Sequence, residues 1–480
     1  MKQFDNLQRS ILPLTYLFQL ICSVFFALRL YDEWGTDYGI YYVGSISSQQ
    51  PEFGLYSGFF DFKGPLYYGF LGILSILISY NFFGAVLSLF ITCLFWFACI
   101  NLAGYLVARD FRQRSILGFA SIAVLMGQGS NSSLSLFQSG LIVLSLSLLY
   151  RYVDNNKRRD LYFSYALAVL SFLVKADSLS LIIFIPLFVL IFSKKVKYLD
   201  LFFGIVFSFL FFLFSLLILS RFLHFKLHEY FYQAIIYVSE TRWSLGNGAT
   251  FKNFIIRDYY SIPLLLGSGL LFALILVGNY STFKVFIRSP SFVILLLGVF
   301  SYGLLQSDKN YHLFVLYPYA LIALVIGVVG FYNFPHYKVL FVVFFTSASV
   351  VNVNYILDSQ CIIAKKVVCS DPYRELLMPN SEKKILEKSF YLNQGWPFLV
   401  NEVLPKINFT VWWPLAVETK FSTTQIIDQA NSSNFPIWVD YNDFIDLQKR
   451  NPLRVNEFMK GKELIRYDLN SKWGQLIPIK

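Results

Sequence analysis

The sequence has few charged residues for its length, and few cysteines. Only 14% of its 480 residues are Asp, Glu, Lys or Arg, whereas 56% are hydrophobic, and the mean hydropathy is +0.55. Soluble domains carry about 25% charged residues, so a soluble globular protein is excluded for the chain as a whole. Five cysteines and 27 glycines also exclude a disulfide-rich scaffold and a collagen-like fibre. The high hydrophobic content excludes a disordered chain.

Several common catalytic and binding motifs are missing from the sequence. It contains no P-loop, no dinucleotide-binding fingerprint, no G-x-S-x-G elbow and no paired C-x-x-C. The net charge of +11 does not indicate a nucleic-acid partner, because the basic clusters lie in short loops between apolar runs, at 109–114, 151–159 and 194–197. This is the positive-inside pattern of membrane proteins, which sets orientation.

Charge divides the chain into two regions. Only 39 of the first 354 residues are charged, against 30 of the last 126. We therefore expect a transmembrane module over 1–354 and a water-soluble domain over 355–480. The tail mixes short apolar runs such as FPIWVDY with polar, helical-looking stretches, which favours a small α/β domain.

The apolar runs predict an α-helical polytopic membrane protein with about eleven spans and a cytoplasmic N-terminus. An additional run at 66–80 is short for a span, and counting it as one would put the basic cluster at 109–114 outside. We therefore expect 66–80 to be an interfacial or re-entrant helix on the outer face. Two long outer segments follow, 30–83 and 223–260, and the tail is extracytoplasmic. The spans are expected near 11–29, 84–107, 115–130, 134–151, 161–174, 178–193, 200–222, 261–278, 291–306, 311–331 and 338–354.

The cysteines and histidines give no support to a metal centre. Cys22, Cys93 and Cys99 lie in apolar runs and are expected to be packing residues. In the polar tail, a disulfide between Cys361 and Cys369 and a pair of free thiols are both open. His224 and His228 would share one face of a continuous helix, but no third ligand at a suitable spacing is evident.

The first outer segment carries the strongest candidate for catalysis. Asp32 and Glu33 come two to three residues after an apolar helix, at the expected membrane interface. A carboxylate in such a partly desolvated position can take a proton from an attacking hydroxyl.

These residues and three further elements resemble the GT-C class of polyprenyl-phosphate-sugar-dependent glycosyltransferases, in particular protein O-mannosyltransferases and the aminoarabinose transferases of lipid A. The pair Asp32-Glu33 is followed by DFKGPLYY at 61–68, similar to the family's lysine element that opens an apolar helix. The run 166–186 resembles a stretch bearing a lysine at the outer face, here Lys175. The run 307–324 resembles a late aromatic-rich segment, and the tail is similar to extracytoplasmic domains of such proteins.

The resemblance implies roles for individual residues. Asp32 is the expected base, and Glu33 orients it or contacts the acceptor. Lys63 is expected to hold the donor phosphate as a point charge. Many relatives carry an acidic residue in the loop before the fourth span, but here 128–136 reads QGSNSSLSL without a carboxylate, which puts a second acidic group in doubt. The other expected substrate-binding residues are Asp37, Lys175, Arg242, Lys309, Tyr311 and His312, and Asp177 is expected to pair with Lys175.

The implied reaction is an inverting transfer of a sugar from a polyprenyl phosphate to a hydroxyl of a lipid, a glycan or a protein. It needs one base and a cation for the leaving phosphate. No dedicated cofactor is expected, and a divalent metal is an open alternative without support in the sequence. The expected location is the outer face of a bacterial cytoplasmic membrane. The alternatives are a transporter or lipid flippase, which would show mid-span charges and internal symmetry, and a non-catalytic assembly protein of the same fold.

Overall fold

The structure is a computed structural model that describes part of the chain. The described residues before the tail are 2–28, 30, 37–51, 54–56, 59–60, 63–108, 111–126, 133–193, 197–237, 288–305 and 316–330. In the tail they are 390–391, 409–410, 437–450, 456, 459–466 and 473–479. Side chains of the first helix are described from Leu12 onward. The expected boundary between 354 and 355, the spans 261–278 and 338–354, and the pair Cys361 and Cys369 lie outside the described residues.

The chain forms two compact units, and each contains segments that are distant in the sequence. The first unit comprises 1–33, 89–215 and 247–364. The second comprises 34–88, 216–246 and 365–480. Residues 34–83 of the first outer segment therefore belong to the same unit as the tail, whereas residues 30–33 belong to the first unit. Two long helices, α4 and α9, contribute residues to both units.

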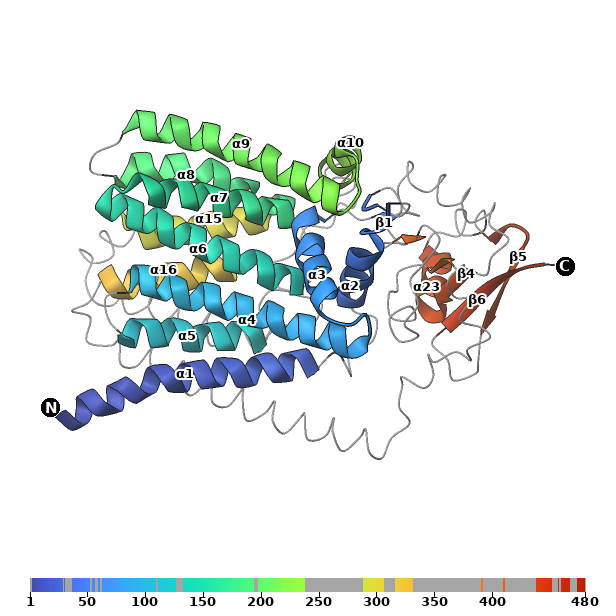
Figure 1. The fold of residues 1–480 in the computed structure, drawn as a ribbon, viewed down its shortest axis with the longest axis horizontal. Helices are drawn as coiled ribbons and strands as arrows, with labels where there is room; N and C mark the ends of the chain where they lie inside the picture. Colours follow the sequence, from blue (N-terminus) through green and yellow to red (C-terminus); the bar gives the residue numbers. More distant parts are fainter. Residues whose placement is uncertain are drawn as a thin grey trace. The chain divides into compact units, whose positions relative to one another are not determined.

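The first unit is a bundle of helices that lie side by side (Figure 1). Neighbouring pairs include α6 with α7, α15 with α16, and α1 with α5. Nine of the eleven expected spans coincide with described helices, which confirms the helical reading of the apolar runs. Their bounds are α1 Lys2–Leu28, α4 Phe82–Val107, α5 Phe111–Met126, α6 Ser133–Asn155, α7 Arg158–Val174, α8 Leu179–Phe192, α9 Tyr198–Phe222, α15 Pro290–Leu305 and α16 Tyr317–Gly330.

Three of the described helices are long and apolar enough to cross a membrane by themselves. They are α4 with 26 residues, α6 with 23 and α9 with 25. At 1.5 Å per residue each exceeds the roughly 30 Å of a hydrocarbon core. Five further apolar helices have 10–17 described residues, so the expected number of eleven spans stays a prediction.

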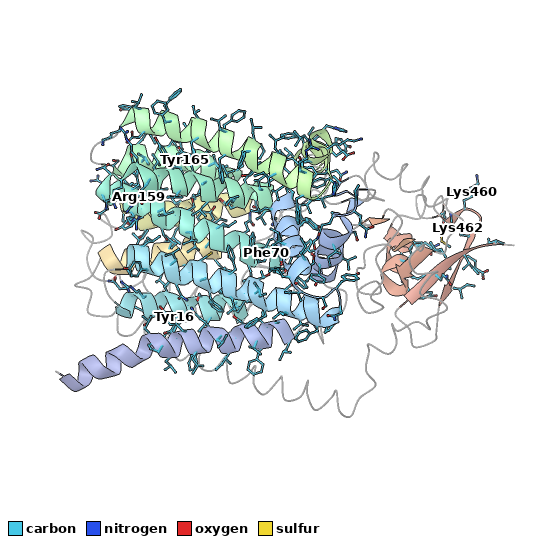
Figure 2. The ribbon with its side chains drawn as sticks, viewed as in Figure 1. Tyr16, Phe70, Arg159, Tyr165, Lys460 and Lys462 are labelled. Atoms are coloured by element: carbon cyan, nitrogen blue, oxygen red, sulfur yellow. The ribbon has the colours of Figure 1, made fainter. Side chains whose placement is uncertain are left out.

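Helix α9 is apolar on nearly all sides although little of it is buried. Only 22% of its most apolar window lies inside the protein, and Phe202, Phe209 and Phe214 are exposed. Such a surface is stable against lipid and not against water. The helix contacts α7 closely, because a Cβ at Gly204 would lie 2.7 Å from a ring carbon of Tyr165 (labelled in Figure 2). Glycine is therefore required at this crossing.

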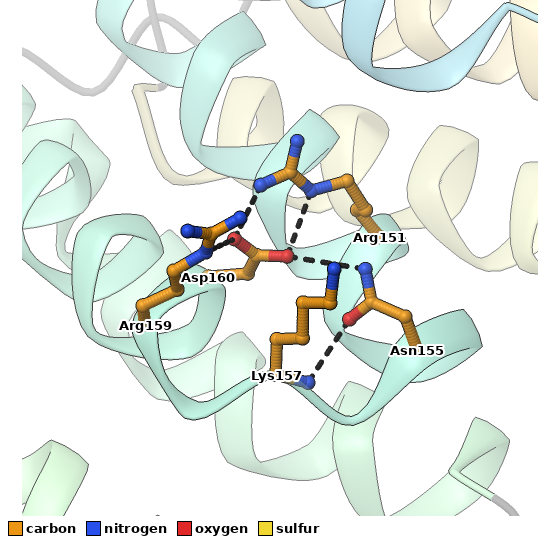
Figure 3. Close-up of polar contacts among 5 residues, drawn as sticks. All are labelled: Arg151, Asn155, Lys157, Arg159 and Asp160. Carbon is orange, nitrogen blue, oxygen red and sulfur yellow. Dashed lines mark hydrogen bonds and ion pairs between the residues drawn. The ribbon is translucent and has the colours of Figure 1, made fainter.

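Arginines at the end of α6 and the start of α7 pair with buried carboxylates. Figure 3 shows Arg151, Asn155 and Arg159 directed toward Asp160, whose side chain is only 1% exposed. Arg151 donates two hydrogen bonds to Asp160, at 2.7 and 2.5 Å, and the Nε of Arg159 lies 3.7 Å from Oδ1 of Asp160. The next arginine, Arg158, pairs at 2.7 Å with the equally buried Asp200 of α9. These contacts thus join three helices, α6, α7 and α9.

The second unit contains the short helices of the two outer segments. They are α2 Asp37–Ser47, α3 Pro65–Leu77, α10 Leu227–Tyr230 and a π-helix, Phe231–Tyr237. Helix α3 starts with Pro65 in the first helical position after Gly64, where a proline loses no helical hydrogen bond. With 13 residues α3 is about 20 Å long, shorter than the hydrocarbon core.

The described part of the tail is a small mixed sheet with one helix. The strand order is β2-β4-β6-β5, with β2 parallel to β4 and the other neighbours antiparallel. A separate strand, β3 Phe409–Thr410, pairs in parallel with β1 Phe59–Phe60 of the first outer segment. The remaining elements are β2 Phe390–Tyr391, β4 Ile437–Asp440, α23 Tyr441–Arg450, β5 Lys462–Arg466 and β6 Trp473–Pro478.

Candidate functional site

The expected base lies in the short connection between α1 and α2. Asp32 and Glu33 are outside the described residues, as are Arg242, Lys309, Tyr311 and His312, so their roles stay predictions. Asp37 is described: it is the first residue of α2 and half-buried. A carboxylate at a helix N-terminus is stabilised by the helix dipole, which by itself accounts for an acidic residue at this position.

Lys63 is buried and stands directly before the start of α3. Only 9% of this residue is exposed, which is unusual for a lysine. The apolar helix α3 begins two residues later, at Pro65, so Lys63 lies just before the N-terminal end of this helix. A cation in such a poorly hydrated position acts strongly on an anion that comes near it.

The backbone of Lys63 is held by a tyrosine from the same segment. The hydroxyl of Tyr56 donates a hydrogen bond of 2.5 Å to the carbonyl oxygen of Lys63. Tyr56 has a φ of 70°, in the left-handed region that side chains other than glycine rarely adopt. Its own carbonyl oxygen accepts a hydrogen bond of 2.5 Å from Nε2 of Gln233, in the π-helix.

Aromatic and backbone contacts extend this link between the two outer segments. The ring of Tyr56 makes an edge contact with Phe225 at 5.2 Å and lies 5.8 Å from Tyr230. The backbone N–H of Leu55 donates to the carbonyl oxygen of Leu223 at 2.9 Å. Leu55 and Tyr56 are therefore held against residues 223–237, the described part of the second outer segment.

Two buried tyrosines of this unit are excluded as bases near neutral pH. Burial raises the pKa of Tyr42 to about 12, and it also raises the pKa of Tyr230. Both hydroxyls therefore stay protonated and can only donate or accept hydrogen bonds.

In the first unit, Lys175 occurs in a buried ion pair. Its Nζ lies 3.1 Å from Oδ2 of Asp177, and the two side chains are 6% and 2% exposed, which confirms the expected pairing. Gln138 of α6 completes the cluster by donating to Oδ1 of Asp177 at 2.5 Å and to Oγ of Ser178 at 2.6 Å. Lys175 ends α7 in an extended conformation, so the pair marks the turn into α8. Its ammonium group is matched by a carboxylate.

The two histidines do not share a helix face. His224 lies in the turn after α9 with a φ of 50°, whereas His228 lies in α10. The helical spacing assumed from the sequence is therefore wrong, because the chain leaves the helical conformation at His224. Within the described ranges, no group of three His, Cys, Asp or Glu side chains could hold a metal ion. Cys22, Cys93 and Cys99 are buried, as expected of packing residues.

Sequence reasoning missed three polar residues at these sites. Gln138 and Gln233 are amides within apolar runs, and a polar side chain in such a run is a usable signal. Tyr56 gave no signal, because a positive φ is anticipated only at glycine, asparagine or aspartate.

Comparisons with known proteins identify the fold. No protein-family model matches the sequence, and no curated protein is significantly similar to it in sequence. The structure of ArnT from Cupriavidus metallidurans bound to undecaprenyl phosphate is similar with a TM-score of 0.55 at 13% identity, over 96% of this chain and 97% of ArnT. The chain is thus a membrane protein with the GT-C fold, as the resemblance implied.

Two further structures give lower scores. ArnT from the same organism in the apo state has a TM-score of 0.42 at 12% identity, over 94% of this chain and 95% of that chain. The archaeal oligosaccharyltransferase AglB from Archaeoglobus fulgidus, in complex with an inhibitory peptide and a dolichol-phosphate, has a TM-score of 0.46 at 13% identity, over 98% of this chain and 74% of that chain.

Proposed function

We propose that the chain is an inverting membrane glycosyltransferase that moves a sugar from a polyprenyl phosphate to a hydroxyl group. The observation that carries the proposal is the shared fold, which extends over nearly the whole of this chain and of a structure holding undecaprenyl phosphate. The buried Lys63 adds a cation suited to a phosphate group.

The proposed reaction is a single displacement at the anomeric carbon of the donor. The acceptor oxygen forms a bond to that carbon while its proton passes to the carboxylate of Asp32. The bond from the anomeric carbon to the phosphate oxygen breaks, and the electron pair leaves with the phosphate, which becomes a monoester. Lys63 stabilises the charge that develops on this leaving group, so the leaving group needs no protonation.

The proposed location follows from the distribution of charge. The N-terminus and the basic loops face the cytoplasm of a bacterium, and segments 30–83 and 223–260 and the tail face outward. In this arrangement the first 354 residues form the transferase module, and residues 355–480 form an extracytoplasmic domain. The acceptor is a hydroxyl of a lipid, a glycan or a protein.

Binding of the carrier lipid is the direct test of the proposal. The full chain in lipid nanodiscs is titrated with undecaprenyl phosphate, and binding is measured by native mass spectrometry. We expect Lys63→Ala to weaken binding at least about tenfold, the loss of one charge-assisted contact. Lys157→Ala, which removes an exposed cation of the predicted cytoplasmic loop between α6 and α7, is the matched control and should bind normally. Equal affinity of the wild type and Lys63→Ala would contradict the proposed role of Lys63.

A further inference from the structure

A chain of two hydrogen bonds leads from the second outer segment to the backbone of Lys63. Gln233 donates to the carbonyl oxygen of Tyr56, and the hydroxyl of Tyr56 donates to the carbonyl oxygen of Lys63, both at 2.5 Å. Tyr56 and Gln233 are 177 positions apart, so only the fold brings them together. The two contacts connect the π-helix to the backbone of the candidate phosphate-binding lysine.

Tyr56 adopts a conformation that the local sequence does not favour. A φ of 70° is strained for a tyrosine, and such strain persists only where the surroundings impose it. Here the contacts with Phe225 and Tyr230 hold the ring, and Gln233 holds the carbonyl group. Strained residues of this kind concentrate at functional sites. The result of the strain is that the tyrosine hydroxyl reaches the carbonyl oxygen seven residues further on.

Gln233 also lies in an unusual element. It is 7% exposed and belongs to a seven-residue π-helix, and π-helices are rare and frequent at functional sites. Its Oε1 is buried and has no hydrogen-bond partner in the part of the chain that the structure describes. Within that part, the hydrogen bond of the Gln233 side chain is therefore the one to the carbonyl oxygen of Tyr56.

We infer that Tyr56 and Gln233 are positioning residues for Lys63, so that the second outer segment sets the affinity for the carrier phosphate. The inference rests on the proposed function, in which Lys63 binds that phosphate. A fixed carbonyl at Lys63 fixes the position from which the side chain starts and thereby limits where the ammonium group can reach. Loss of either hydrogen bond lets the lysine occupy other positions, and binding then carries the cost of ordering it.

The test uses undecaprenyl phosphate and the full chain in nanodiscs. Tyr56→Phe removes the hydroxyl but keeps the ring, and Gln233→Met keeps a similar volume but removes the donor. Each variant should raise the Kd for undecaprenyl phosphate about three- to tenfold, the effect of one hydrogen bond. The Kd of the double variant should be at most about twofold higher than that of the weaker-binding single variant, because the two hydrogen bonds act in series. The number of binding sites per protein should stay unchanged, whereas a folding defect would lower it.

Two comparisons make the outcome decisive. Tyr38→Phe is the matched control: it removes another buried tyrosine hydroxyl bond, 3.0 Å to the carbonyl oxygen of Ala85, in the same unit, and should leave the Kd unchanged. In a Lys63→Ala background, Tyr56→Phe should have no further effect. Normal affinity of Tyr56→Phe, or an equal loss with and without Lys63, would overturn the positioning role and leave the proposed function standing. Normal affinity of Lys63→Ala itself would remove the proposed function and the inference with it.

Discussion

Lys63 and Lys175 illustrate how differently two lysines expected in one role can be placed. Lys63 is 9% exposed and has its carbonyl fixed by Tyr56. Lys175 is 6% exposed at its side chain and faces Asp177 at 3.1 Å. A lysine matched by a buried carboxylate is first a structural element, because its charge is already compensated. Lys63 stays the candidate for the phosphate site because it lies in DFKGPLYY, the element that resembles the family's lysine element.

The buried pair Lys175–Asp177 should be costly to break from one side. Asp177→Asn leaves a buried ammonium group without its countercharge, which costs about 3–5 kcal/mol. We expect a clearly lower midpoint of thermal unfolding, measured in detergent. The double variant Lys175→Met with Asp177→Asn should recover most of the loss, since no charge remains buried. The exposed Lys157→Met is the control. A double variant less stable than Asp177→Asn would contradict this account.

Asp32 should be essential for chemistry and dispensable for binding. Asp32→Asn keeps the size of the side chain but removes the base, so sugar transfer should slow at least about 100-fold. Binding of undecaprenyl phosphate should stay unchanged, because the carboxylate does not contact the phosphate in the proposed mechanism. Transfer is measured with a panel of undecaprenyl-phosphate sugars, with Asp154→Asn, an exposed carboxylate of the predicted cytoplasmic end of α6, as the control. Full transfer by Asp32→Asn would exclude it as the base.

Among single residues, an ion pair between close neighbours could be predicted from the sequence, whereas an unusual backbone conformation could not. The pairing of Lys175 with Asp177 was predicted from a two-residue spacing at a helix end and is confirmed. The positive φ of Tyr56 could not be predicted, because contacts with residues distant in the sequence hold it. For Tyr56 the imposing residues include Gln233, 177 positions away.

At the scale of elements, apolar runs predicted helices well because burial in a bundle or in lipid selects for length and composition alone. Helices α4, α6 and α9 begin and end within a few residues of the expected spans. The π-helix Phe231–Tyr237 was not predicted, since it differs from an α-helix in hydrogen bonds that span one residue more, and over seven residues the hydrophobic pattern does not separate the two. The pairing of β1 with β3 also depends on partners far apart in the sequence.

The hairpin of α6 and α7 should depend more on Asp160 than on Asp200. Asp160 accepts two hydrogen bonds from Arg151, whereas Asp200 pairs with the more exposed Arg158. Hydrogen bonds to charged groups contribute about 1.5–3 kcal/mol each when protected from solvent, and exposed pairs contribute less. Asp160→Asn should therefore lower the thermal midpoint more than Asp200→Asn does. The opposite order would show that the contact between α7 and α9 dominates at this end of the bundle.

At the scale of the whole molecule, the fold follows from composition together with the similarity to ArnT, and the orientation in the membrane stays a prediction. Nine expected spans coincide with helices, but only three of the described helices are both long enough and apolar enough to cross a membrane by themselves. The side of the membrane on which each loop lies therefore depends on the parity of the count and on the basic loops.

The orientation can be tested at the two points where the count is most sensitive. Helix α3 has 13 residues, about 20 Å, and is expected to stay on the outer face without crossing. Alkaline phosphatase, which is active only outside the cytoplasm, should be active when fused after Tyr80 and inactive when fused after Arg114. If α3 crossed, both results would be reversed: Tyr80 would lie inside, and Arg109, Arg112 and Arg114 would lie outside, against the positive-inside rule. Activity after Arg114 would move the proposed catalytic segment 30–83 partly across the membrane. The residues that follow α3 would then lie on the opposite side of the membrane from Asp32. Lys63 precedes α3 and would still lie on the same side as Asp32.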